Sequence, residues 1–232
     1  MTTLIRLELK KNNIRPYIIS AVCITLAMFG FVYLFAGVSD EELEDYALIV
    51  ALVSCLIMAS YAILGGVMFA RFAVDEYKGK RAMLLFSYPV SRSRVLLAKT
   101  LLVCGFVFAS TLATSCTVFA SFQFSETFAP LVHDNATNTI LSIAMTIAVI
   151  NGIQAVTISM ISLMLGLWKE SEPTTIVSTV IITSLMANFV SELILTGTMN
   201  SIAQQVALTV AFLLVAAGAF ALSSKRVNAI EI

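Results

Sequence analysis

The sequence has few charged residues, too few for a water-soluble fold of its length. Only 12% of its 232 residues are charged, and 59% are hydrophobic. Soluble domains typically contain roughly 25% charged residues. The composition therefore excludes a soluble enzyme, and a net charge of zero disfavours a nucleic-acid-binding protein, which needs a basic surface. We expect an integral membrane protein.

Residues that commonly serve in catalysis are also scarce. The single histidine, His133, stands beside Asp134 in an expected loop. The four cysteines fall inside apolar runs and form no C-x-x-C pair: Cys23, Cys55, Cys104 and Cys116. Membrane-embedded enzymes need a nucleophile with its base, or a cluster of metal ligands. The sequence predicts neither a catalytic site nor a metal site, and the cysteines are interpreted as small apolar residues of the spans.

Long charge-free runs dominate what is present. Crossing about 30 Å of hydrocarbon takes roughly 20 helical residues, and each run is about that long or longer. Nothing alternates with the period of a strand, so the expected class is all-α, as a single transmembrane domain over residues 1–232. The expected helices number six: 17–38, 46–70, 95–121, 138–167, 174–194 and 205–222.

The basic residues predict the topology. With six spans, all 14 Lys and Arg residues fall on one side, and the loops of the other side carry no Lys or Arg but several Asp and Glu residues. The positive-inside rule then puts both termini in the cytoplasm of a multi-pass cell-membrane protein. Residues 1–16 mix leucine and isoleucine with basic residues, which is typical of an amphipathic helix lying on membrane lipid.

Polar residues inside the predicted spans are neutral. Asn151, Gln154 and Asn188 are the notable ones, and they either bond helices together or line a substrate path. The scarcity of ionisable residues inside the spans disfavours proton coupling. Two stripes of small residues predict close helix packing. They are Ala62, Gly66 and Ala70 in the second predicted helix, and Ala109, Ala113, Thr117 and Ser121 in the third.

The longest polar stretch on the basic side is residues 71–94. Arg71 and Asp75 stand one helical turn apart, which predicts that the second helix continues past the membrane with a local ion pair and ends at Gly79. Residues 80–87 allow a short helix with an apolar cluster, closed by Pro89. Such a segment either rests on anionic lipid or docks a partner protein.

The same stretch resembles the membrane subunits of ATP-binding-cassette (ABC) exporters of the type-2 permease family. The residues that carry the resemblance are Glu76, Gly79, Lys80, Leu84, Leu85, Pro89-Val90-Ser91-Arg92 and Lys99. The resemblance implies that the segment is a coupling helix seated in a groove of the ATP-binding subunit. It thereby implies a set of ATPase-coupling residues: Asp75, Glu76, Gly79, Lys80, Arg81, Leu84, Leu85, Phe86, Tyr88, Pro89 and Arg92.

The resemblance also implies a function and partners. This chain would be the non-catalytic permease subunit of a bacterial exporter, forming half of the substrate path with a second permease copy or a sister permease. Two ABC ATP-binding subunits would bind ATP and Mg, since Gly79-Lys80 lacks the other glycine of a phosphate-binding loop. An amphipathic peptide, antibiotic or hydrophobic compound is the expected cargo. The alternatives are a non-transporting sensor, assembly or immunity protein, and an ion-coupled carrier or channel.

Overall fold

The computed structural model describes residues 13–37, 46–77, 92–128, 138–195 and 200–229. Within these ranges the chain forms long α-helices and one short 3-10 helix, and no strand, so the all-α prediction is confirmed. The elements are α2 (Arg15–Gly37), α3 (Tyr46–Phe72), η1 (Val74–Tyr77), α5 (Arg92–Phe128), α6 (Asn138–Lys169), α7 (Glu172–Leu195) and α8 (Asn200–Ala229). Each long helix corresponds to one of the predicted ranges and covers it in full, except that residue 38 of the first range lies outside the described residues. The proposed interfacial helix at residues 1–16 lies almost wholly outside the described residues.

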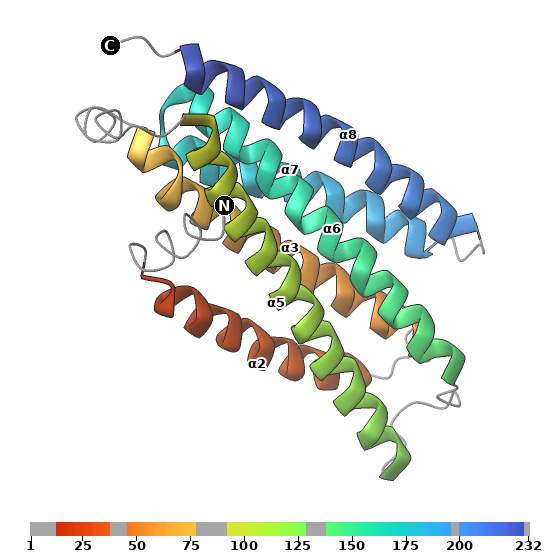
Figure 1. The fold of residues 1–232 in the computed structure, drawn as a ribbon. Coiled ribbons are helices and arrows are strands. Elements are labelled where there is room, and N and C mark those ends of the chain that lie inside the picture. Colours follow the sequence, from red (N-terminus) through yellow and green to blue (C-terminus); the bar gives the residue numbers. More distant parts are fainter. Residues whose placement is uncertain (1–12, 38–45, 78–91, 129–137, 196–199, 230–232) are drawn as a thin grey trace.

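Successive long helices run in opposite directions (Figure 1). The first residues of α2, α5 and α7 and the last residues of α3, α6 and α8 therefore lie at one end of the bundle. Basic residues stand near all of these helix ends, and we call this the basic end: Arg15, Arg71, Arg94, Lys169, Lys225 and Arg226. In the described helices the predicted gathering of basic residues at one end is thus confirmed.

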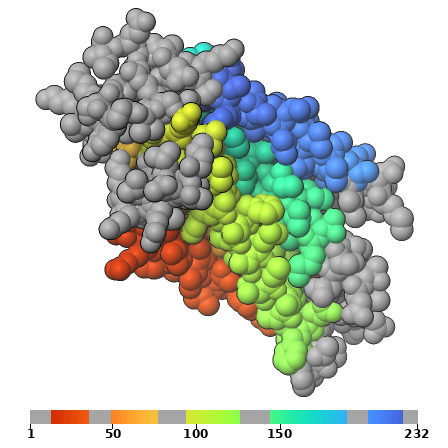
Figure 2. Space-filling model, in the orientation of Figure 1, coloured from red at the N-terminus to blue at the C-terminus, as the bar shows by residue number. Residues whose placement is uncertain are grey.

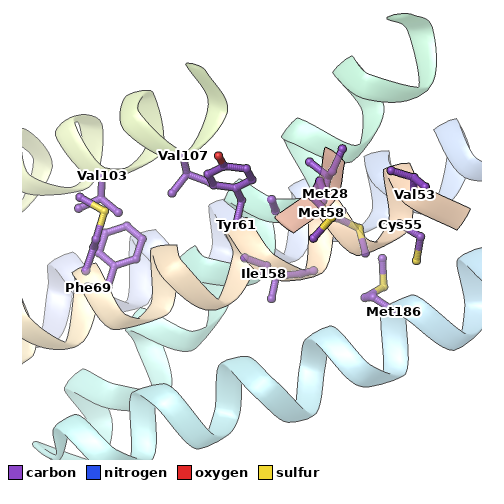
Figure 3. Close-up of a cluster of buried hydrophobic side chains, with 14 of the residues drawn as sticks. Met28, Val53, Cys55, Met58, Tyr61, Phe69, Val103, Val107, Ile158 and Met186 are labelled. Atoms are coloured by element: carbon purple, nitrogen blue, oxygen red, sulfur yellow. The ribbon is translucent and has the colours of Figure 1, made fainter. Parts of the chain in front are cut away.

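Two helices form the centre of the bundle. In their membrane-length segments 67% of α3 and 61% of α6 is buried, against 11% of α2 and 22% of α8. α3 packs against α2, α5, α6 and α7. Figure 3 shows part of the resulting core, where Phe69 of α3 lies beside Val103 of α5 and Tyr61 of α3 lies beside Val107 of α5.

Small residues let α3 approach its neighbours closely. A Cβ atom on Gly66 would collide with the side chain of Thr179 on α7, and one on Gly65 would lie 2.9 Å from Cβ of Ser159 on α6. Ala62 and Ala70 of the same stripe are fully buried, which confirms its predicted packing role. The α5 stripe differs, because Ala109, Ala113 and Thr117 are exposed and Ser121 is half-buried. This second stripe does not pack against the other described helices, because α5 turns its other face to α3 and α6.

Five of the helices are long and apolar enough to cross a membrane. Their spans are Arg15–Phe35, Ile49–Glu76, Arg94–Ser125, Ala144–Lys169 and Ala203–Ser223. Large apolar side chains on the bundle surface, such as Ile19, Leu26 and Leu214, are more than 60% exposed, which fits contact with lipid. α7 is not among the five, and its described part carries many hydroxyl side chains and Asn188. The sixth span therefore stays a prediction.

α6 and α7 are joined by a tight turn at the basic end. Glu170 has a φ of 49°, the left-handed conformation that often follows a helix, and the N–H of Ser171 donates to the carbonyl of Gly166 at 3.2 Å. α7 begins at Glu172, and Pro173 lies in its first turn, where a proline is favoured. This turn brings α7 back beside α6, and Thr175 of α7 then fits against Gly166 of α6.

Candidate functional site

The basic end contains a joint between α3, η1 and α5. α3 ends at Phe72, and the chain continues at once into the 3-10 turn η1, with the N–H of Glu76 donating to the carbonyl of Ala73 at 3.2 Å. The predicted continuation of the α-helix as far as Gly79 is therefore wrong. After Phe72 the chain winds more tightly and forms the 3-10 turn. As a result, Glu76 points back toward α5, where a lysine lies.

That lysine is Lys99, two helical turns into α5. Its Nζ donates to Oε2 of Glu76 at 2.6 Å and to the main-chain carbonyl of Phe72 at 2.8 Å. The carbonyls of the last helical turn have no partner within their own helix, and a cation near them interacts favourably with the helix dipole. Lys99 thus caps the end of α3 while Glu76 neutralises its charge, and we call these two side chains the α3–α5 latch.

The latch is secluded from solvent. Only 1% of the Lys99 side chain and 14% of the Glu76 side chain are exposed. An ammonium group in such surroundings is strongly destabilised unless a carboxylate and further hydrogen bonds accompany it. Because Lys99 of α5 binds both Glu76 of η1 and the last turn of α3, η1 is held against both helices. The arrangement is a structural connection between these three elements.

The latch borders the segment for which the sequence predicts a coupling role. Asp75 and Glu76 are half-buried, and Arg92 is the first residue of α5. The other predicted coupling residues lie outside the described residues: Gly79, Lys80, Arg81, Leu84, Leu85, Phe86, Tyr88 and Pro89. In the chain, η1 directly precedes residues 78–91 and α5 begins directly after them, so the latch connects the described elements on either side of that segment.

Of the three polar residues expected along a substrate path, two lie together and one does not. Asn151 and Gln154 of α6 are 2% and 0% exposed. Gln154 Nε2 donates to Oγ1 of Thr209 on α8 at 2.9 Å, which is the interhelical hydrogen bonding considered from the sequence. Asn188 is exposed on α7, and its Nδ2 donates to the carbonyl of Ser184 in its own helix at 2.8 Å.

A groove of about 400 Å³ opens on the surface between α5, α6 and α8, and neither Asn151 nor Gln154 lines it. Its lining is almost wholly apolar and includes one threonine. The lining residues are Leu101, Cys104, Gly105, Phe108, Ile153, Val156, Thr157, Met160, Leu213, Ala216 and Ala217. In Figure 2, α6 is seen between α5 and α8 on this face of the molecule. None of the lining residues is charged, so the groove suits an uncharged, apolar group.

A second polar contact ties the peripheral helix α2 to the bundle. The hydroxyl oxygens of Tyr61 and Thr114 lie 2.6 Å apart, and those of Thr25 and Thr114 lie 2.8 Å apart. The Tyr61 hydroxyl also lies 3.3 Å from the carbonyl of Ala21. These groups satisfy one another inside the membrane-length helices, so the cluster is structural.

Sequence reasoning missed two pairings. Glu76 and Lys99 were both identified from the sequence, but their contact, between residues 23 positions apart, was not predicted. The position of one ionisable residue at each end of the same loop could have indicated it. Gln205 and Thr209 of α8 were overlooked, although both are less than 7% exposed. Polar residues one turn apart in the last apolar run were the signal for them. Among the described residues no group of three His, Cys, Asp or Glu residues could hold a metal ion.

These features define a multi-pass α-helical membrane protein with a latched joint at its basic end. The chain matches the model of the ABC-2 family transporter protein over residues 4–188, and it belongs to this family. Members are the non-catalytic membrane subunits of ABC transporters, which implies an ABC ATP-binding partner subunit. The match covers the whole region from α2 through the latch and the amides of α6.

A bacterial relative shares most of the chain. It is "Uncharacterized protein YcbO" of Bacillus subtilis (strain 168), 27% identical over 192 residues, which are 80% of this chain and 83% of the relative. No solved structure matches the chain significantly.

Proposed function

We propose that this chain is one half of an ABC exporter permease, driven at its basic end by a separate ATP-binding subunit. The α3–α5 latch is the observation that carries the proposal. Lys99 Nζ donates to Glu76 at 2.6 Å and to the main-chain carbonyl of Phe72 at 2.8 Å, and η1, which carries Glu76, directly precedes residues 78–91 in the chain. A displacement of that segment would therefore move the end of α3 and the start of α5 together instead of being absorbed by a loose loop.

The assembly follows from the helix number. We take α7 as the sixth span, because it runs beside α3 and α6 in the same bundle and has Glu192 near its far end. Both termini then lie in the cytoplasm with the basic end. Two copies, or this chain and a sister permease, would form the transport path on two ATP-binding subunits. Those subunits would hold ATP and Mg, and this chain would hold neither.

The cargo we propose is an amphipathic peptide, an antibiotic or another hydrophobic compound. The support is chemical. The groove between α5, α6 and α8 is lined by uncharged residues, of which Thr157 alone is polar. A molecule taken from the membrane meets no charge there that would have to lose its hydration.

The coupling role is tested by truncating the apolar anchors of residues 78–91. Leu84→Ala combined with Leu85→Ala should release the ATP-binding subunit or uncouple hydrolysis from transport, because losing a central anchor commonly costs about 2 kcal/mol or more. Lys80→Ala is the matched control at the rim and should have a much smaller effect. The measurement is copurification of the ATP-binding subunit, followed by transport in proteoliposomes at equal permease content.

Two results would contradict this proposal. Normal ATPase association and transport in the double-leucine variant would remove the docking role, and a stronger defect in Lys80→Ala would favour a segment that rests on anionic lipid. Uptake by the lone chain driven by a proton gradient would contradict the permease role itself. A passive sensor or immunity protein would leave hydrolysis by the ATP-binding subunit unresponsive to every cargo tried.

A further inference from the structure

The groove between α5, α6 and α8 opens toward the lipid that surrounds the bundle. All three helices carry membrane-length segments. The walls are exposed, since Leu101 of α5 is 55% and Leu213 of α8 is 47% exposed. The α6 residues Ile153, Val156 and Met160 are half-buried, so α6 forms the floor. A molecule that occupies the groove therefore enters it from the membrane.

The groove lies in the half of the membrane that is nearest the basic end. Arg94 begins the membrane-length segment of α5, and the α5 lining extends from Leu101 to Phe108. At 1.5 Å per residue, this lining starts about 11 Å from Arg94 and ends about 21 Å from it. Half of the hydrocarbon core is about 15 Å thick, and one head-group region adds roughly 5–8 Å. With Arg94 among the head groups, the groove ends near the membrane midplane.

Two side chains suited to the membrane surface lie between the groove and the basic end, on the helix faces that form the groove. Arg94 is exposed and precedes Leu101 by seven residues, which is about two helical turns. Trp168 is the only tryptophan of the chain, and it is 60% exposed. It follows Thr157 of the groove by eleven residues, which is about three turns. Both residue types favour the head-group region of a membrane.

The charge at this end of the groove is positive and has no counter-charge from the protein. Arginine keeps its positive charge under all ordinary conditions. No acidic side chain pairs with Arg94 in the part of the chain that the structure describes. The groove lining itself contains no charged residue. A matching ligand therefore has a negative group at the membrane surface and an apolar chain below it.

We propose that the groove binds one acyl chain of an anionic phospholipid from the basic-end leaflet, with the lipid phosphate at Arg94 and the glycerol region beside Trp168. The volume of about 400 Å³ is at the small end of the range for ligand sites, which suits a single chain. A zwitterionic lipid carries its own ammonium group and gains less from Arg94. This inference goes beyond the proposed function, and a hydrophobic cargo that enters the groove would displace the lipid chain.

The test compares two photolabelling lipids, phosphatidylglycerol and phosphatidylcholine, that carry the same diazirine-bearing acyl chain. Each is added as a small fraction to phosphatidylcholine nanodiscs that contain the full chain, and labelled peptides are quantified by mass spectrometry. α7 is the internal reference, because it has exposed apolar side chains and no Lys or Arg. Relative to α7, groove peptides of α5 and α8 should carry about fivefold more label from phosphatidylglycerol than from phosphatidylcholine.

The head-group contact is tested by Arg94→Gln, which removes the cation and leaves the groove. Labelling of the groove by phosphatidylcholine should persist, and the preference for phosphatidylglycerol should disappear. Arg15→Gln is the matched control. Arg15 is also exposed and also begins a membrane-length helix, but α2 does not line the groove. This variant should keep the fivefold preference.

The acyl-chain contact is tested by Gly105→Phe, which fills the groove and leaves Arg94 in place. A Cβ atom on Gly105 meets nothing within 4 Å, so the ring can enter the groove without disturbing the helix packing. Labelling of the groove by both lipids should fall to the level of α7. Gly30→Phe on α2 is the matched control, because its Cβ atom also meets nothing within 4 Å. An unchanged unfolding temperature in detergent shows that each variant keeps its fold.

Four results would overturn the lipid site. They are equal labelling of the groove by the two lipids in the unmodified chain, a fivefold preference that survives Arg94→Gln, groove labelling that survives Gly105→Phe, and groove labelling by both lipids no higher than that of α7. The last result would leave the groove to the cargo. These measurements need no ATP-binding subunit, so a failure of the lipid site is distinguished from a failure of the permease role.

Discussion

At the scale of residues, the least usual feature is a lysine buried where a membrane helix begins. The Lys99 side chain is 1% exposed and is accompanied by a carboxylate and a helix-end carbonyl. A buried ion pair adds little net stability to a fold, because the free-energy cost of removing two charges from water offsets much of their attraction. Its consequence is geometric: η1 can hold its position against α5 only while both charges are present.

The latch predicts strong non-additivity between its members. Glu76→Gln or Lys99→Met alone should each destabilise the chain by about 3–5 kcal/mol, because either change leaves the partner without its counter-charge. The double variant should be more stable than the sum of the two single effects predicts. Thermal unfolding of the four proteins in detergent provides the measurement, and additive losses would show that the two charges are not coupled.

Contacts between residues far apart in the chain could not be predicted from the sequence. Glu76 and Lys99 were each identified from the sequence, but only the turn of η1 after Phe72 directs the carboxylate to Lys99 instead of along an extended α3. The bond from Gln154 to Thr209 joins residues 55 positions apart. Its prediction would require knowing that α6 and α8 are neighbours and how each is rotated about its axis.

At the scale of elements, α3 is organised by small residues that admit close neighbours. Gly66→Ala should destabilise the chain by about 1–3 kcal/mol, because the added methyl collides with Thr179 on α7. Gly30→Ala in α2 is the matched control, with nothing within 4 Å of the new atom, and should be neutral or stabilising because alanine favours helix. Unfolding temperatures in detergent compare the two, and equal shifts would contradict the close approach of α3 and α7.

At the turn between α6 and α7 we expect the opposite effect, namely a gain in stability when a glycine is introduced. Glu170 adopts a φ of 49°, which costs an L-residue with a side chain about 1 kcal/mol or more and costs glycine almost nothing. Glu170→Gly should therefore stabilise the chain by about 1 kcal/mol. Glu170→Ala keeps the unfavourable conformation and should bring no such gain. A loss of stability in the glycine variant would contradict this turn geometry.

The sequence predicted the elements better than their faces. Helix positions follow from the lengths of the apolar runs, because a membrane leaves the backbone few alternatives to a helix. Orientation is different, because lipid-facing and protein-facing sides of such helices are similarly apolar. The exposed stripe from Ala109 to Thr117 on α5 and the buried stripe of α3 have similar composition, and only the assembled bundle distinguishes them.

At the scale of the whole molecule, the described basic residues gather near one end of the bundle, where the latch lies. The apolar groove begins at Leu101, just beyond Lys99, and extends away from that end along α5 as far as Phe108. This arrangement suits a protein that receives a movement at one end and accommodates an apolar group within the membrane. α3 takes part in the latch, and its contacts with α2, α5, α6 and α7 connect it to most of the bundle.

The most direct test of the account is a photocrosslink between the basic end and the ATP-binding subunit. p-Benzoylphenylalanine would replace Arg81 in the coupling segment and, as the control, Leu34, an exposed residue near the far end of α2. In membranes that contain both subunits, we predict crosslinking to the ATP-binding subunit from position 81 and none from position 34. Crosslinks from position 34, or none from position 81 in a correctly inserted chain that copurifies with the ATP-binding subunit, would contradict coupling through the basic end.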